Sequence, residues 1–170
     1  AKPAFSTTRG GKEPSSIAVH PSDDRLAVGF TDSTAVDVYD SAALRRRFTA
    51  NTKGVENGTL SSTSWSSDGR RLYAAGEYYR DGKHNVLVWD RAGEGPLREL
   101  EASLSTISEL LPCGNDIALG AADPAFGLIS PDGNRRLWRD HVQADMRGSL
   151  GQRLTISKDG ARVRFALKES

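Results

Sequence analysis

The sequence predicts an all-β protein built from repeated units of four short strands. One turn pattern, an apolar residue followed by a polar stretch that closes on Asp-Gly or a substitute, occurs four times. Its leading apolar residues are at positions 19, 65, 110 and 156, so the steps are 46, 45 and 46 residues. A constant step of this size is typical of repeat architectures. The runs between the turns alternate apolar and polar residues, as strands do, and none of them keeps a helical period.

The first two copies show the plan most clearly. The first copy covers about residues 16–50, and its expected strands are 17–19, 26–30, 36–40 and 44–49. The second copy covers about 61–101, and its expected strands are 63–65, 72–76, 85–90 and 97–100. Short alternating runs bounded by Gly, Pro, Asp and Ser are the usual sequence mark of antiparallel strands. Each copy therefore predicts one small antiparallel sheet, and we expect Trp65 and Leu72 of the second copy to be buried between neighbouring sheets.

The other two copies are less regular. The third, about residues 105–140, has a strand pair at 117–120 and 126–129 and a further run at 136–138. The fourth, about 150–167, contains two expected strands, 154–156 and 163–167. Residues 1–15 are rich in Lys, Gly, Ser and Pro, so we expect a loop or a stray outer strand there. The expected organisation is this N-terminal stretch and one repeat segment over 16–170.

Two motifs recur at equivalent places in these copies. Trp89-Asp90 closes the third strand of the second copy, and Tyr39-Asp40 stands at the same place in the first. Ser67-Asp68-Gly69 and Lys158-Asp159-Gly160 form first-hairpin turns. In these residues the chain resembles the WD-repeat β-propeller proteins of the bacterial kind, over about residues 16–167. The resemblance implies blades of four antiparallel strands that stack around an axis. A β-sandwich also uses short strands, but it does not require the recurring step.

The number of copies predicts an incomplete ring. Three four-stranded copies and a half copy make about 3.5 blades, whereas closed propellers typically have four to eight. We therefore expect the ring to be completed by further blades of a larger protein or by another chain, with self-association as one route. The apolar stripes expected at the open ends include Val86, Val88, Val163 and Phe165.

Charge and composition exclude several classes of partner. The chain has 23 basic and 22 acidic residues, a net charge of +1, so no overall field attracts nucleic acid or an anionic membrane. No apolar run of 18 residues is present, and we expect no membrane contact. The single Cys113 excludes an internal disulfide. With no visible signal peptide, these features favour a cytoplasmic location.

Residues for catalysis or cofactor binding do not gather in the sequence. His20, His84 and His141 fall in three separate expected turns, without the spacing of metal ligands. No Gly-x-Ser-x-Gly nucleophile motif occurs, and Gly93-Glu94-Gly95-Pro96 lacks the strand-to-helix context of a phosphate loop. We therefore predict no enzyme activity, no cofactor and no metal site.

The most distinctive surface feature is the enlarged hairpin at residues 77–84. Loops carry binding functions more often than the elements they join, and Tyr and Arg are frequent at binding hot spots. We predict that a protein partner contacts this hairpin through a set of five residues: Tyr78, Tyr79, Arg80, Lys83 and His84. The alternative is that Tyr78 and Tyr79 pack the hairpin onto its own blade.

These observations favour a non-catalytic interaction scaffold, a WD-repeat-like propeller segment that docks a protein partner. The alternative is a propeller enzyme or small-ligand binder that uses the central channel. That alternative needs acidic, His or Arg side chains on the first strand of each copy. Those strands offer mainly uncharged residues, namely Ile17, Val19, Thr63, Trp65, Leu154 and Ile156, which argues against it.

Overall fold

The computed structural model describes residues 8–122, 125–139, 154–157 and 162–165. Within these ranges every regular element is a β-strand. The same ranges contain no helix with the length and apolar character needed to cross a membrane. The predicted all-β class is therefore confirmed.

The first sheet follows the expected plan. Its strands pair antiparallel in chain order: β1 (Pro14–Val19), β2 (Arg25–Phe30), β3 (Val36–Asp40) and β4 (Arg46–Thr49). Every strand expected in residues 16–50 is present, and β1 begins before the expected start at residue 17. The structure therefore extends the first strand by two residues into the stretch 1–15, which was expected to be a loop or a stray outer strand.

The second sheet carries an extra short strand. It contains β5 (Ser62–Trp65), β6 (Leu72–Ala75), β7 (Tyr79–Arg80), β8 (Lys83–Trp89) and β9 (Leu97–Ser103). Strands β6 and β7 pair one after the other with the same edge of β8, and β9 pairs with its opposite edge. The enlarged hairpin is thus an extension of the β6–β8 pair beyond the body of the sheet.

The third sheet has four strands and the last has two. The third contains β10 (Ile107–Cys113), β11 (Asp116–Ala121), β12 (Ala125–Ile129) and β13 (Arg135–Arg139). The last pairs β14 (Leu154–Ile156) with β15 (Val163–Phe165). The sequence had no clear alternation over 107–113, so β10 was not singled out as a strand. The structure places it at the position that the repeat requires.

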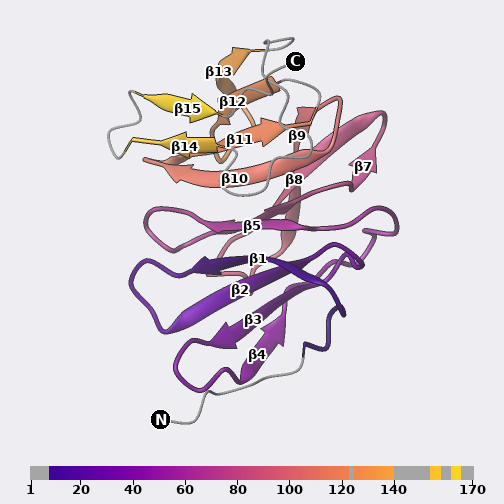
Figure 1. Cartoon of the computed structure of the whole chain (residues 1–170), viewed down its shortest axis with the longest axis vertical. Coiled ribbons are helices and arrows are strands. Elements are labelled where there is room, and N and C mark those ends of the chain that lie inside the picture. The colour runs from indigo at the N-terminus through magenta and orange to yellow at the C-terminus, as the bar shows by residue number, and fades with distance from the viewer. Residues whose placement is uncertain (1–7, 123–124, 140–153, 158–161, 166–170) are drawn as a thin grey trace.

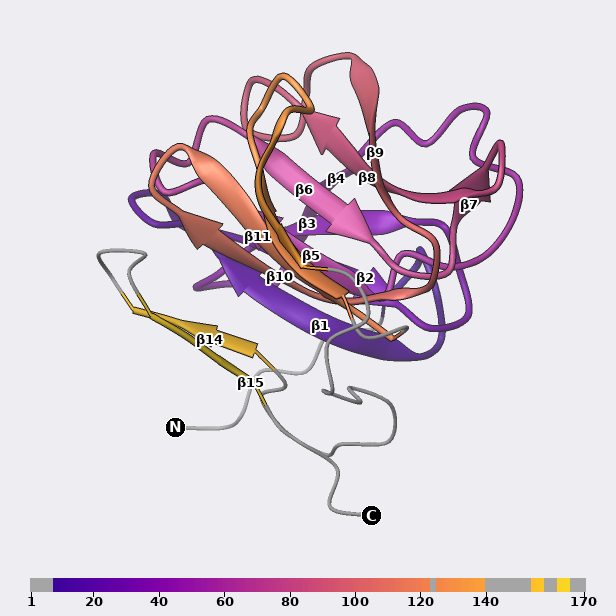
Figure 2. The same cartoon turned by 90° about the horizontal axis from the view of Figure 1, so that it is seen from above.

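The sheets stack face to face, and each turns its first strand to the same side. In Figure 1 the first strands β1, β5, β10 and β14 lie one above another, and Figure 2 shows strands such as β3, β6, β8 and β9 behind β1. Strand β5 contacts β1 on one side and β10 on the other, and β10 also contacts β14. The described sheets form an open stack of blades, as expected for an incomplete ring.

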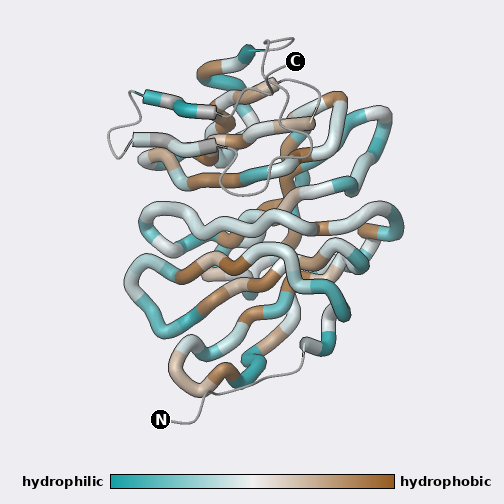
Figure 3. Tube along the Cα trace, viewed as in Figure 1, coloured by the Kyte–Doolittle hydropathy of each residue, from teal (hydrophilic) through white to brown (hydrophobic). Residues whose placement is uncertain are grey.

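Apolar side chains fill the spaces between neighbouring sheets, and Figure 3 shows that the hydrophobic residues are concentrated in the strands. Between the first and second sheets, one cluster includes Val38, Trp65, Leu72 and Trp89. Trp65 is 3% exposed and Leu72 is completely buried, as the repeat pattern predicted. Apolar burial of this kind drives folding, and it is possible here because each sheet covers a face of the next.

One expectation about the open ends is wrong. Val86 and Val88 were expected on an uncovered face, but both are completely buried. They lie in a second cluster, between the second and third sheets, with Tyr73 and Leu110. The reason is that the second sheet is internal to the stack, so each of its faces meets a neighbour. The side chains of Val163 and Phe165 lie outside the described residues.

The repeated turns also join neighbouring blades. Gly69 has φ +72°, a conformation that glycine adopts without strain. The Gly69 carbonyl lies 2.9 Å from Nε2 of His20, which belongs to the corresponding turn of the first sheet. The His20 ring also lies edge-on against Trp65, at 4.8 Å between ring centres. His20 is therefore a buried contact between two blades. The expected turn at 158–160 lies outside the described residues.

The two ends of the blades carry different connections. At one end, the turns after the first and third strands meet, and Ser41 N donates to Asp24 O at 2.7 Å. At the opposite end, the crossing between the first two sheets meets the β6–β7 connection, and Glu77 N donates to Thr59 O at 3.1 Å. The short turns therefore lie at one end of the blades, and the enlarged hairpin lies at the other end. An antiparallel strand order requires this arrangement.

Candidate functional site

The hairpin at residues 77–84 ends in a tight two-residue turn. Asp81 and Gly82 have φ of 52° and 75°, so both central positions are left-handed. Two positive φ values in succession are typical of the type I′ turn, whose twist matches that of paired strands. The turn pairs Arg80 with Lys83 and Tyr79 with His84. Strand pairing therefore fixes the positions of four of the five predicted contact residues relative to one another.

Tyr78 lies inside the molecule and does not belong to the exposed surface. Its side chain is 1% exposed, and its hydroxyl donates to Glu99 Oε2 at 3.0 Å. Burial, together with the hydrogen bond to Glu99, raises the pKa of Tyr78 to about 12. Because a ring in this position cannot reach a partner, the packing alternative describes Tyr78. Tyr79, in contrast, is 53% exposed.

The hairpin is tied to its surroundings by two polar groups. The Asn57 amide accepts from Tyr79 N and donates to Tyr79 O, each at 3.1 Å, as a neighbouring strand would. Glu99 accepts from Arg80 Nη1 as well as from Tyr78 and Asn85. Arg80 Nη2 also donates to the Gly54 carbonyl at 2.8 Å. Side chains held in this way lose little further freedom when a partner binds.

Leu104 extends the exposed surface, and the sequence analysis did not select it. Strand β8 pairs His84 with Tyr79 on one side and with Ser103 on the other. Leu104 follows Ser103 directly and is 66% exposed. The signal available in the sequence was a leucine between two serines, just after an expected strand. We refer to five residues as the rim patch: Tyr79, Arg80, Lys83, His84 and Leu104.

The rim patch combines aromatic, aliphatic and cationic groups. The Tyr79 and His84 rings lie 6.0 Å apart, with a tilt of 46° between them. Lys83 and His84 are half-buried, and Arg80 is exposed while bonded to Glu99. The patch can offer apolar contact, hydrogen-bond donors and positive charge to a partner. No hydrogen bond joins a nucleophilic side chain of the rim patch to a basic one.

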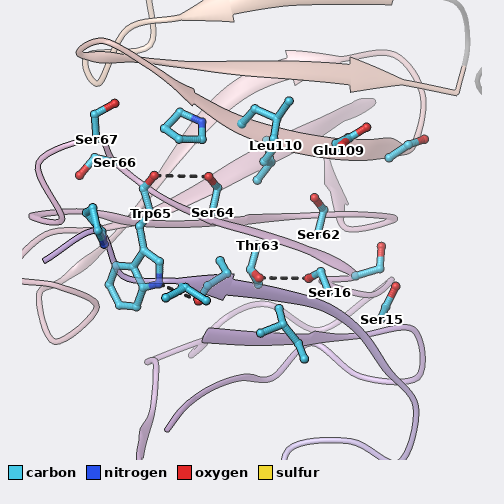
Figure 4. Close-up of a pocket in the computed structure, with 18 of the residues that line it drawn as sticks. Ser15, Ser16, Ser62, Thr63, Ser64, Trp65, Ser66, Ser67, Glu109 and Leu110 are labelled. Atoms are coloured by element: carbon cyan, nitrogen blue, oxygen red, sulfur yellow. Dashed lines mark hydrogen bonds between the residues drawn. The ribbon is translucent and has the colours of Figure 1, made fainter. Parts of the chain in front are cut away.

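A second candidate site is a cleft along the first strands of the blades (Figure 4). Its volume is about 730 Å³, and residues of β1, β5 and β10 line it. Of the twenty described residues that line it, eleven are Ser or Thr, and Glu109 is the one ionisable residue among those twenty. Such a lining can hydrogen-bond a neutral polar molecule, but it supplies little for acid–base chemistry.

The first-strand residues expected to face the axis divide between two environments. Ile17 and Val19 are 68% and 69% exposed. Thr63 and Trp65 turn toward the first sheet, where Ser16 and Thr63 hydroxyls lie 3.0 Å apart and the Trp65 indole donates to Ala18 O at 3.1 Å. The side chains of Leu154 and Ile156 lie outside the described residues.

Metal-binding groups do not gather within the described ranges, where no cluster of three His, Cys, Asp or Glu residues occurs. His20 and His84 lie at opposite ends of the blades, and His141 is outside those ranges. The absence of cofactors and metals stays a prediction.

Comparison with known proteins identifies the architecture. No protein-family model matches the chain, and no curated protein matches it. The structure of U3-55K, a WD40 protein, is similar with a TM-score of 0.65 and 15% identity, over 79% of this chain and 42% of that one. The propeller-containing hydrazine synthase of Kuenenia stuttgartiensis is similar with a TM-score of 0.67 and 15% identity, over 88% and 40%.

The fold is that of β-propeller blades. At 15% identity the similarity shows the fold alone, and one similar structure is an enzyme whereas the other is not named as one. The chain spans about two fifths of each of these structures. The activity and partners of either protein therefore do not transfer to this chain by similarity.

Proposed function

We propose that this chain is a non-catalytic protein-interaction scaffold, a WD-repeat-like propeller segment of a larger protein or assembly. The rim patch docks a protein partner. The proposal includes a bacterial origin and a cytoplasmic location, with neither nucleic acid nor membrane as a partner. What carries it is the pair of exposed side chains at one end of the second blade, Tyr79 at 53% and Leu104 at 66%.

The contacts around the patch support a binding role. Large apolar side chains at exposed positions are favourable anchors for a partner when polar groups surround them. Arg80 and Lys83 provide such groups, and Arg80 is already oriented by Glu99 and the Gly54 carbonyl. Because the hairpin is held by Asn57 as well, a partner meets a surface that is already ordered.

The alternative function, a small-ligand binder or an enzyme, belongs to the cleft of Figure 4. The observation in its favour is the hydroxyl lining, which suits a neutral polar ligand. Against an enzyme, the described lining consists mainly of Ser and Thr hydroxyls and apolar side chains, and these supply little acid–base chemistry. The scaffold proposal therefore takes precedence.

A double variant separates the two functions. Tyr79→Ser with Leu104→Ser removes both exposed apolar anchors while leaving buried Tyr78 in place. We expect normal folding and a loss of the proteins captured by the immobilised chain from extract of its source cells. Arg70→Ser is the matched control, because the Arg70 side chain is 83% exposed on a turn at the opposite end of the same blade. Equal capture by the double variant and the control would reject the rim patch as the docking site.

A further inference from the structure

Asn57 holds the exposed edge of the 77–84 hairpin with a single side-chain amide. Its Oδ1 accepts from Tyr79 N and its Nδ2 donates to Tyr79 O, both at 3.1 Å. An amide can make both bonds because it carries an acceptor and a donor side by side, whereas an ionised carboxylate only accepts. The contact between the Tyr79 backbone and the crossing at residues 50–60 therefore depends on Asn57 remaining an amide.

The packing of the hairpin requires a glycine directly after this asparagine. Gly58 has φ +64°, which glycine adopts without strain, and a Cβ at this position would lie 2.5 Å from Tyr78 N. The sequence contains five asparagines, and Asn57 is the one that a glycine follows. An asparagine before glycine is especially reactive, because no side chain shields the glycine nitrogen from the amide carbon of the asparagine. The fold thus places a chemically labile pair at the anchor of the hairpin.

The two reacting groups of this pair are accessible. Asn57 and Gly58 are both exposed. The Gly58 N–H donates to no group among the described residues, so no hydrogen bond holds its nitrogen there. Within the same part of the chain, Tyr79 is the one hydrogen-bond partner of the Asn57 amide. A local opening of the hairpin edge, of the kind that exposed elements undergo, is therefore enough to free the amide.

We propose that Asn57 is a site of spontaneous deamidation, and that its conversion releases Tyr79 from the crossing at residues 50–60. The Gly58 nitrogen attacks Cγ of Asn57 and forms a cyclic imide. The Cγ–Nδ2 bond breaks, and ammonia leaves with the proton that the Gly58 nitrogen loses. Water then opens the imide at one of its two carbonyl carbons, which gives aspartate or isoaspartate. Water is the only co-reactant, so no enzyme and no oxidant is needed.

Either product loses the match to Tyr79. Aspartate replaces the donating Nδ2 with an oxygen that faces the Tyr79 carbonyl, so a hydrogen bond becomes a repulsive contact. Isoaspartate adds a carbon to the backbone before Gly58, where the close approach to Tyr78 N leaves no room for it. Tyr78 keeps its own bond to Glu99, so the change is confined to the exposed edge of the hairpin. A loss of docking after conversion rests on the proposed function of the rim patch, but the conversion itself does not.

Peptide mass spectrometry of the purified chain, aged in mildly alkaline buffer, tests the site. The peptide that contains Asn57 should convert first, ahead of the peptides with the four other asparagines. Asn57→Gln is the matched control, because it keeps an amide whose longer side chain forms the corresponding ring far more slowly, and this variant should show no early conversion. Earlier conversion of another asparagine would overturn the assignment of Asn57.

A pair of variants separates an effect of the structure from the reactivity of the Asn-Gly sequence alone. Arg80 joins the hairpin to the same crossing, because its Nη2 donates to the Gly54 carbonyl at 2.8 Å. Arg80→Ala should speed the conversion of Asn57 by about fivefold, the change expected when one hydrogen bond that keeps the hairpin edge closed is lost. Arg70→Ala, at an 83% exposed side chain on the opposite end of the blade, should leave the rate unchanged. Equal rates in the two variants would refute the link between hairpin opening and conversion.

Amide hydrogen exchange tests the release of the hairpin edge. In the isoaspartate form, separated from the unconverted chain by chromatography, the Tyr79 N–H should exchange about fivefold faster, as expected for the loss of one hydrogen bond. The Leu87 N–H, in the completely buried part of β8, should exchange at the same rate in both forms. Unchanged exchange at Tyr79 would contradict the proposed release. These measurements use the isolated chain without a partner, so they keep their meaning even if the rim patch docks no protein.

Discussion

Replacing Trp65 with alanine should destabilise the fold more than any surface change, because Trp65 joins the first two blades. The side chain is 3% exposed and lies in the cluster that contains Val38 and Leu72. Truncating a buried Trp to Ala typically costs about 3–5 kcal/mol. The lost indole bond to the Ala18 carbonyl, 3.1 Å in length, contributes about 1 kcal/mol of that change.

Trp65→Phe divides the effect into its two parts. It keeps most of the packing but removes the indole donor, so we expect a loss of about 1–2 kcal/mol. Tyr79→Ala is the matched control, because that ring is 53% exposed and its loss should change stability by about 0.5 kcal/mol or less. The assay is urea unfolding followed by far-ultraviolet circular dichroism. If Trp65→Ala and Tyr79→Ala unfold at the same urea concentration, Trp65 does not join two blades and the proposed stacking is refuted.

Three further outcomes follow from local geometry. Gly69→Ala should cost about 2–4 kcal/mol, because it combines an unfavourable φ with overlap on the His20 ring. Gly82→Ala, with a similar φ and open space around it, should cost about 1–2 kcal/mol; equal losses in urea unfolding would argue against the His20 contact. Hydrogen bonds from the Lys12 and Glu13 amides lower the pKa of Asp32, so its stabilising effect is present above the ordinary value of 3.8 and is lost as the pH falls through the lower folded pKa. The Lys12 amide signal in nuclear magnetic resonance should titrate with a midpoint below 3.8, and a midpoint at or above 3.8 would show that residues 8–13 do not bind Asp32. Circular dichroism of the chain should show strand without dominant helix.

Repetition explains why the strands were predictable. The recurring turn fixed the phase of each copy, and the alternation around it marked the buried face, so Trp65 and Leu72 were correctly placed between blades. Strand β10 was harder to recognise, because Pro112 and neighbouring apolar residues give no alternation. The sequence analysis therefore expected no strand over 107–113, although the position of Leu110 in the repeat corresponds to a first strand.

Which faces are covered was harder to predict. Val86 and Val88 read as an open stripe, but their burial depends on the third blade, which is distant in the sequence. Residues 8–13 carry little apolar character, and they cover the first blade through backbone bonds to Asp32 and Asp37. Such contacts join segments that no local pattern relates.

The candidate site was predictable in part for the same reason. An enlarged hairpin is visible in the sequence, and its Asp81-Gly82 turn is a strong local signal. Whether Tyr78 or Tyr79 points inward depends on Glu99, which comes from another strand of the blade. Leu104 joins the rim patch through the pairing of β8 with β9, a contact that the hairpin sequence does not contain.

Site-directed photo-crosslinking tests the central claim most directly. A photoreactive phenylalanine analogue introduced at Tyr79 would be irradiated in the source cells, with the same analogue at Arg70 on the opposite end of the blade as the control. If the rim patch docks a protein, position 79 should give a discrete crosslinked species that Leu104→Ser diminishes, and position 70 should not give it. Crosslinking at position 70 in place of position 79, or equal crosslinking at both, would contradict the assignment of the rim patch as the docking surface.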